Sequence, residues 1–139
     1  MPGCVLRLSG PRVALASALD GAFVTFEESR ACQRGRRLGR TTEADESTFN
    51  FTVSHADGDH VPVQVREAET FLVSHAAELT VLRSRNGVTN GLLDFGWSIP
   101  SDGVGQFNRF PSSLLTLCSK LGLDIEVSIY LGESGDSDA

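Results

Sequence analysis

The sequence predicts an α+β fold: a mostly antiparallel sheet of four to five strands with about three helices on one face, broadly ferredoxin-like in plan. Two observations predict it. Short segments in which apolar and polar residues strictly alternate lie between longer segments in which apolar residues recur every three to four positions. The alternation also leaves one face of each strand polar, which is typical of antiparallel sheets that are covered on one side only.

Four segments have the alternation of a half-buried strand. The clearest is 123–131, where apolar residues occupy every second position from Leu123 and polar or amphipathic residues lie between them. The segments 4–9, 49–55 and 93–99 have the same pattern. A short apolar segment at 23–26 is a candidate for a fifth strand.

Three helices are expected between these strands. The first covers 11–19, where a proline suits the first turn. The second and longest begins at 62 or 65 and runs to 85, with a 3.6-residue apolar stripe that includes His75. Its start is ambiguous, because the valines before it also alternate as in a strand. The third covers 111–121, and Gly122 is expected to end it.

The length and composition fit one domain. The chain has 139 residues, and we expect the domain to span 1–131 and the acidic segment 132–139 to be a disordered tail. The segment 29–47 has almost no apolar residues and is expected to be a mobile loop. No apolar run is long enough for a membrane span, and the first residues lack the features of a signal peptide, so we expect a cytoplasmic protein without membrane contact.

Charge and cysteine content narrow the function classes further. The net charge of −6 disfavours general binding to nucleic acid, because phosphate backbones repel an acidic domain. The three cysteines are widely spaced, which supports neither a disulfide framework nor a zinc site. We expect Cys4 and Cys118 to be buried core residues. Cys32 lies among arginines that favour its thiolate, but no histidine or resolving cysteine lies nearby in sequence, and the simpler interpretation is an ordinary exposed thiol.

Several short motifs stand together in the second half of the chain, over roughly 65–131. They are Leu93-Asp94-Phe95-Gly96, Gln106, Phe110-Pro111, Leu114-Leu115, Leu121-Gly122 and Glu126–Tyr130, with a weaker echo in Glu69–Leu72. In these motifs the chain resembles a family of small uncharacterised bacterial proteins, a domain of unknown function. The resemblance implies a fold of the class described above and supplies no activity and no catalytic residues.

One short segment offers four candidate metal ligands within six residues: His55, Asp57, Asp59 and His60. Imidazoles and carboxylates at this spacing can converge on one ion. The simpler interpretation is a turn, because Asp-Gly is a favoured turn dipeptide after a strand. The sequence offers few further ligands, so we expect neither a catalytic metal nor any other cofactor.

A cluster of five arginines falls within eleven residues: Arg30, Arg34, Arg36, Arg37 and Arg40. Guanidinium groups bind phosphate and carboxylate in a bidentate manner, so the cluster is a candidate site for an anion or an acidic partner. The alternative is a solvated loop that balances the acidic segments on either side of it.

The polar face of the sheet is the last candidate site. It would carry Asp94, Glu126 and Tyr130 if the strands are neighbours, with seven further polar residues around them: Arg7, Asn50, Thr52, Ser54, Ser98, Asp124 and Ser128. Converging carboxylates and a tyrosine can bind a polar ligand or act as acid and base. The alternatives are an open, wetted sheet face and a face buried in a homodimer.

The sequence favours binding over catalysis, because it contains no serine-nucleophile elbow and no cofactor fingerprint. We therefore expect a non-enzymatic protein-binding domain, for example an immunity-type or regulatory partner of another protein. The alternative is a small-ligand or anion-binding domain that uses the arginine cluster or the polar sheet face.

Overall fold

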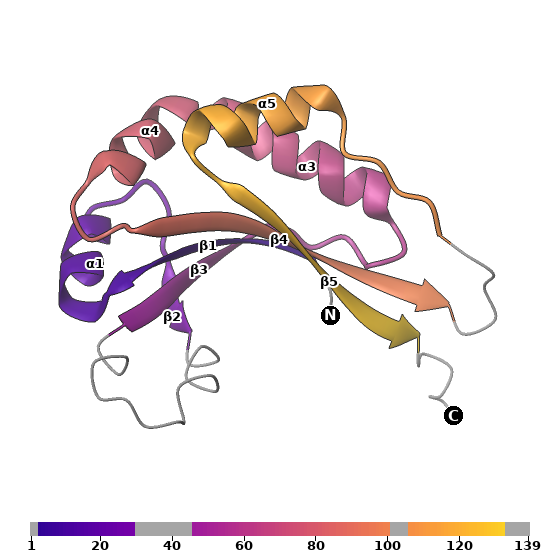
Figure 1. Cartoon of the computed structure of the whole chain (residues 1–139), viewed down its shortest axis with the longest axis horizontal. Helices are drawn as coiled ribbons and strands as arrows, with labels where there is room; N and C mark the ends of the chain where they lie inside the picture. The colour runs from indigo at the N-terminus through magenta and orange to yellow at the C-terminus, as the bar shows by residue number, and fades with distance from the viewer. Residues whose placement is uncertain (1–2, 30–45, 101–105, 133–139) are drawn as a thin grey trace.

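The structure, a computed structural model, describes residues 3–29, 46–100 and 106–132 (Figure 1). The arginine cluster, Cys32 and the acidic segment 133–139 lie outside these residues. The elements follow in the order β1 (Cys4–Pro11), α1 (Arg12–Leu19), β2 (Glu27–Ser29), β3 (Glu46–Ser54), α3 (Val61–Ser74), α4 (Ala76–Ser84), β4 (Asn90–Pro100), α5 (Ser112–Leu121) and β5 (Asp124–Gly132).

The described strands form one open, mixed sheet in the order β2-β3-β1-β4-β5. Neighbouring strands are antiparallel except β4 and β5, which are parallel and are joined through α5. A parallel neighbour needs such a crossover, because a tight hairpin joins only antiparallel strands. The α+β class with a mostly antiparallel sheet is confirmed, and the ferredoxin-like detail stays a prediction.

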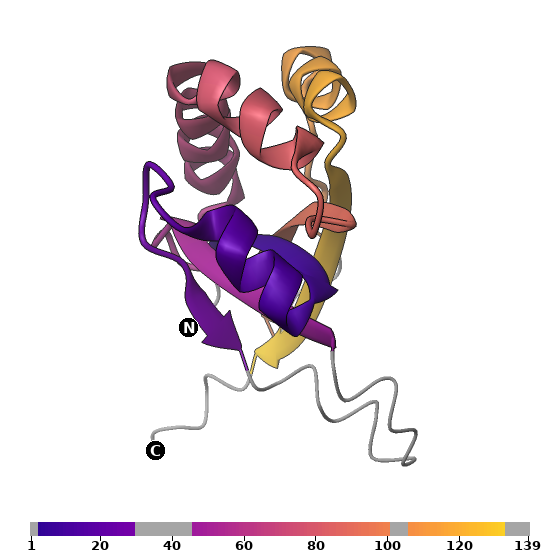
Figure 2. The same ribbon diagram turned by 90° about the vertical axis from the view of Figure 1, so that its left-hand side faces the viewer.

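The helices cover one face of the sheet. Figures 1 and 2 show α3, α4 and α5 on the same side of the strands, while α1 lies beside the ends of β1 and β3. Alternate residues of the central strands point into this layer, and Leu6, Leu8, Leu93 and Phe95 are fully buried. Full burial of each such side chain contributes about 1.5–3 kcal/mol to folding. The core therefore fixes which face of every strand is left polar.

The prediction of one long helix over 62–85 is wrong in one respect. The structure has two helices there, α3 and α4, which meet at His75. The backbone of His75 has φ −118° and ψ 22°, which is not helical. Its ring stacks on Phe23, with 4.7 Å between the ring centres, and contacts Phe71 at 4.8 Å. The described residues thus form four helices rather than three.

The fifth strand also lies elsewhere than predicted. Residues 23–26 are irregular, and β2 begins at Glu27. Phe23 and Phe26 contact each other and reach Phe71 and Phe51 respectively, so their aromatic packing accounts for the apolar character that suggested a strand. The predicted end of the third helix is correct: Gly122 has φ +70°, a conformation that glycine adopts without the usual steric cost.

Candidate functional site

A chain of polar side chains crosses the face of the sheet that the helices leave open. Arg7 of β1 donates from Nη1 to Oδ1 of Asn50 on β3, at 3.1 Å, and from Nη2 to Oδ2 of Asp94 on β4, at 2.9 Å. The Ser128 hydroxyl of β5 donates to the other carboxylate oxygen of Asp94, at 2.8 Å. The chain therefore ties four adjacent strands together, and we call these four residues the Arg7 network.

The Arg7 network satisfies its own charges. Asp94 is only 7% exposed, and both of its carboxylate oxygens are taken by Arg7 and Ser128. A buried carboxylate needs such partners, because an unpaired one would carry a large desolvation cost. This arrangement is suited to holding the strands in register, and it leaves little of Asp94 accessible to a ligand.

The three residues predicted to form a polar site lie on one face but do not converge. Asp94 is the register neighbour of Glu126, whereas Tyr130 is paired with Ser98, about 13 Å further along β5 at the usual rise per residue. Glu126 and Tyr130 are exposed and have no hydrogen bond or ion pair with any residue that the structure describes.

One residue predicted on this face, Ser54, faces the helices instead. The register between β1 and β3 shifts between Cys4 and Val5, where Cys4 is paired with Ser54. Ser54 is 1% exposed, and its hydroxyl donates to a carboxylate oxygen of Glu67 on α3, at 2.6 Å. The irregularity at the strand end thus turns a polar residue toward α3, which strict alternation did not anticipate.

The outermost strand on one side, β5, presents an open edge. It is paired with β4 on one side over all nine of its residues, and no described strand is paired with its other side. In Figure 1, β5 crosses in front of β4, so that this edge faces the viewer. We call this the β5 edge.

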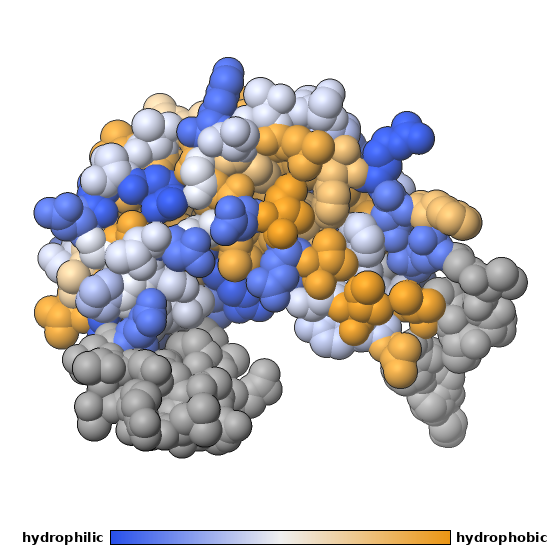
Figure 3. Space-filling view, in the orientation of Figure 1, coloured by the Kyte–Doolittle hydropathy of each residue, from blue (hydrophilic) through white to orange (hydrophobic). Residues whose placement is uncertain are grey.

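Large apolar side chains gather at the C-terminal end of β5. Ile129, Tyr130 and Leu131 are 56%, 51% and 80% exposed. Figure 3 shows apolar surface in the lower right of the view, where β4 and β5 end in Figure 1. We call these three consecutive residues the apolar end. Ile129 and Leu131 lie on the helix side of β5 and Tyr130 lies on the open face, so both faces of this strand end expose large side chains, and a group of such side chains marks binding sites more often than isolated surface residues do.

The opposite edge of β4 is covered at the same level. The backbone amide of Ser98 donates to the carbonyl of Gly58, at 3.1 Å, and the Gln106 side chain donates to the Ser98 carbonyl, at 2.8 Å. A Cβ on Gly58 would lie 2.5 Å from the Ser98 amide nitrogen, so only glycine permits this close approach. The two strands therefore differ: local segments cap β4, while the β5 edge stays open among the described residues.

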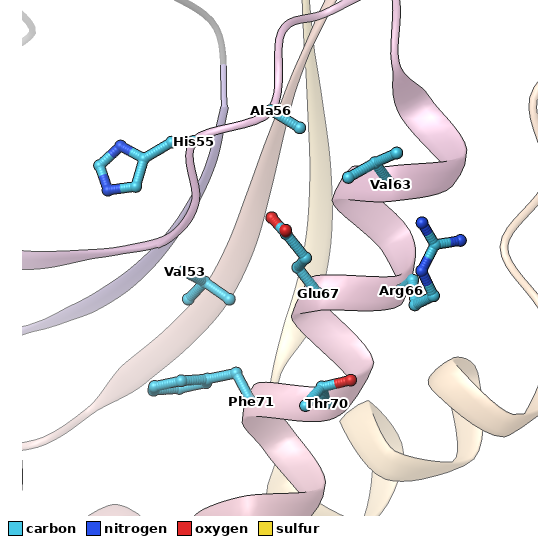
Figure 4. A pocket seen from close by; sticks show the side chains of 8 residues that line it. All are labelled: Val53, His55, Ala56, Val63, Arg66, Glu67, Thr70 and Phe71. Carbon is cyan, nitrogen blue, oxygen red and sulfur yellow. The ribbon is translucent and has the colours of Figure 1, made fainter.

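The candidate metal ligands are only partly brought together. Asp57, Asp59 and His60 place one ligand atom each within 4.8 Å of one another, and all three are exposed. His60 Nδ1 lies 3.5 Å from a carboxylate oxygen of Asp59. His55 is not part of this group. In Figure 4 its ring points away from α3, while Glu67 points from α3 toward the strand.

The loop that carries these residues has a structural anchor. Gln64, fully buried in the first turn of α3, donates from its side-chain amide to the carbonyls of Ala56, Asp57 and Gly96, at 2.9–3.2 Å. The amide thus fixes residues 56–57 against β4. Residues 57–60 form a turn in which the His60 amide donates to the Asp57 carbonyl, at 2.9 Å, and the expectation that this turn holds no metal stays a prediction.

Shallow hollows flank α3. One, of about 670 Å³, lies between α3 and the end of β3 and includes Val53, Glu67 and Phe71 (Figure 4). Another, of about 510 Å³, lies between the start of α3 and the segment 107–111. Arg66 lines both, and Arg109 lines the second. Both arginines are exposed and unpaired within the described chain, which is common for surface guanidinium groups.

Cys4 and Cys118 are buried, as predicted. Burial raises the pKa of the Cys118 thiol to about 11. Burial, followed by the nearby Asp94 carboxylate and by Cys118, raises the pKa of the Cys4 thiol well above its ordinary range. Both thiols therefore stay protonated at neutral pH, and neither has the thiolate character of a reactive cysteine.

No protein-family model, curated protein or solved structure matches this chain. Among the helices that the structure describes, none has the length and apolar character needed to cross a membrane.

Sequence reasoning missed the β5 edge and the apolar end. The alternation over 123–131 identified the strand, but it placed Ile129 and Leu131 on a buried face. Whether they are buried depends on how far α5 extends over the sheet and on which strand is outermost. No local sequence signal carries either fact.

Proposed function

We propose that this chain is a non-enzymatic protein-binding domain that takes up an extended segment of another protein along the β5 edge. The observation that carries the proposal is the apolar end: three consecutive large side chains, each more than half exposed, on a strand whose outer edge is paired with no strand that the structure describes. Strand addition of this kind draws its affinity from main-chain hydrogen bonds and its specificity from alternate side chains.

The contrast between the two edges of the sheet supports this assignment. Proteins protect open edges by keeping them short and by placing charges on them. The other outer strand, β2, has three residues, of which two are glutamates. By comparison, β5 has nine residues, and none of the residues from Val127 to Gly132 is charged. Its C-terminal half therefore has neither form of protection.

The state of the polar face also favours binding over catalysis. Asp94 is occupied by Arg7 and Ser128, and Tyr130 lies well away from it along β5. The alternative, a small-ligand or anion-binding domain, has less support, because the Arg7 network is internally satisfied and the arginine cluster lies outside the described residues. The cytoplasmic location and the resemblance to the bacterial family stay predictions.

A peptide that can bind only by adding a strand to the sheet tests the proposal. The probe is a peptide as long as β5, nine residues, in which serine alternates with valine. Methylation of alternate backbone nitrogens blocks one of its edges, so that it cannot form stacks of more than two strands but can still pair with β5 through its free edge. A matched peptide methylated along both edges cannot pair. We expect the first peptide to bind with a dissociation constant in the micromolar range, measured by NMR titration, and the second not to bind.

A matched pair of variants locates the binding. Leu131→Asp places a charge in the apolar end, and Val13→Asp places one on α1 at a residue of nearly equal exposure, 81% against 80%. We expect Leu131→Asp to abolish binding of the one-edge peptide and Val13→Asp to leave it unchanged. Equal binding by both variants would refute the assignment of the site to β5.

A further inference from the structure

We infer that the segment taken up by β5 is basic and amphipathic: it alternates basic with apolar residues, and its basic residues lie beside Asp124 and Glu126. This inference rests on the proposed function and goes beyond it, because it assigns the chemistry of the partner. It follows from the different character of the two faces of β5, each of which a newly added strand would extend.

The open face of β5 offers two unpaired carboxylates. Asp124 and Glu126 are exposed and belong to the same alternating set as Ser128, whose hydroxyl reaches the Arg7 network on that face. Neither carboxylate has a hydrogen bond or an ion pair within the described parts of the chain. The nearest register neighbour of Glu126 is Asp94, whose charge is already matched by Arg7. A cation on an added strand would therefore supply an opposite charge that no residue in the described ranges provides.

The helix-side face of β5 requires the opposite chemistry. Ile125 packs against the core, and alternation places Val127, Ile129 and Leu131 on the same side. Ile129 and Leu131 extend beyond the buried region and are mostly exposed. Apolar side chains on the added strand would cover them and continue the core outward. A strand that satisfies both faces must alternate, with basic residues on the open side and apolar residues on the helix side.

The charge of the whole chain favours a basic partner over a second copy. The net charge is −6, so a basic segment is attracted from a distance while an identical chain is repelled. A second copy that added its own β5 would bring Asp124 and Glu126 and no cation, because β5 contains no basic residue. Dimerisation through β5 is therefore an outcome that the test must separate from the one we infer.

Three peptides test the inference. Each has nine residues and one methylated edge, and valine alternates with lysine, serine or glutamate. We expect the lysine peptide to bind about three- to tenfold more tightly than the serine peptide, and the glutamate peptide to bind most weakly, because each opposite-charge pair across strands contributes modestly. The preference for lysine should shrink as salt is raised, since these carboxylates are exposed.

Paired variants show whether the preference comes from β5. The double variant Asp124→Asn, Glu126→Gln removes both carboxylates, and the control Asp20→Asn, Glu78→Gln removes two exposed carboxylates elsewhere, so that the net charge changes equally. We expect the first variant to bind the lysine and serine peptides equally and the control to keep the full preference. A preference that survives in the first variant would overturn the inference.

The outcomes separate the inference from the proposed function. Equal binding of the lysine and serine peptides by the unaltered protein overturns the inference but leaves strand addition in place. Binding of none of the peptides overturns strand addition itself. A dimer at micromolar concentration in light scattering, lost in Leu131→Asp and kept in Val13→Asp, would assign the β5 edge to a second copy and overturn the basic partner.

Discussion

Replacement of Asp94 by alanine tests the electrostatic account of the sheet. The substitution removes the acceptor of two hydrogen bonds, from Arg7 at 2.9 Å and from Ser128 at 2.8 Å. It leaves the Arg7 guanidinium with Asn50 as its remaining partner in the Arg7 network. β4 and β5 would then lose their side-chain links to the network, while Arg7–Asn50 and Ser9–Thr48 would still join β1 to β3.

The size of the effect follows from burial. A hydrogen bond to a charged group contributes about 1.5–3 kcal/mol to folding stability. Asp94 accepts two such bonds and its side chain is only 10% exposed, so the sum of the two is the upper limit of the expected loss of folding stability. The Arg7 side chain is 31% exposed, so water can replace part of what it loses. We therefore expect Asp94→Ala to lower the free energy of unfolding by about 3 kcal/mol, which lowers the melting temperature by about 10 °C for a domain of this size.

Urea unfolding followed by circular dichroism measures this loss, and Asp124→Ala provides the matched control. Asp124 is an exposed carboxylate of β5 without a partner among the described residues, so its removal should change the free energy of unfolding by less than about 0.5 kcal/mol. A double-mutant cycle with Arg7→Ala should give a coupling energy of about 1–2 kcal/mol. Equal effects of Asp94→Ala and Asp124→Ala would refute the reasoning.

Further predictions concern the thiols, the acidic loop and a close backbone approach. The unfolded Cys118 thiol ionises near pH 9, whereas the folded one keeps its proton until about pH 11. The stability that this pKa difference contributes is complete below pH 9 and is lost as the pH rises toward 11. In urea unfolding, the free energy of unfolding of Cys118→Ala should therefore fall less over that window than that of the unaltered protein. Zinc or manganese should bind the protein no more tightly than high micromolar in equilibrium dialysis, and tight binding abolished by Asp59→Asn would contradict the turn interpretation. Gly10→Ala should destabilise the fold by about 1–3 kcal/mol in thermal unfolding, because the new Cβ would clash with the backbone carbonyl oxygen of Gly87, and an unchanged melting temperature would show that this approach is not tight.

The local sequence pattern was sufficient to predict the elements that have one face packed against the core. Alternation located β1 and β5 because each has one buried and one open face. The 3.6-residue apolar stripe did not predict the break between α3 and α4 at His75, whose ring contacts Phe23 and Phe71, because such contacts between distant segments are not visible in a local pattern. The local pattern failed again at 23–26, because aromatic clustering and strand formation produce the same apolar signal.

The candidate sites also show what a local sequence pattern cannot predict. Alternation placed Arg7, Asn50, Asp94 and Ser128 on one face, but it could not show that they pair with one another, because strand order is not encoded locally. That pairing decides whether Asp94 is free or occupied. The β5 edge was likewise beyond local pattern, since any of several strands could have been outermost.

Amide hydrogen exchange with the one-edge serine–valine peptide tests strand addition at β5 most directly. Amides that point out of an open edge exchange quickly, and pairing with a new strand protects them. We predict that alternate amides of β5 become protected when the peptide binds, while those of β2 do not. Protection confined to β2, to the hollows beside α3 or to no strand at all would contradict the account.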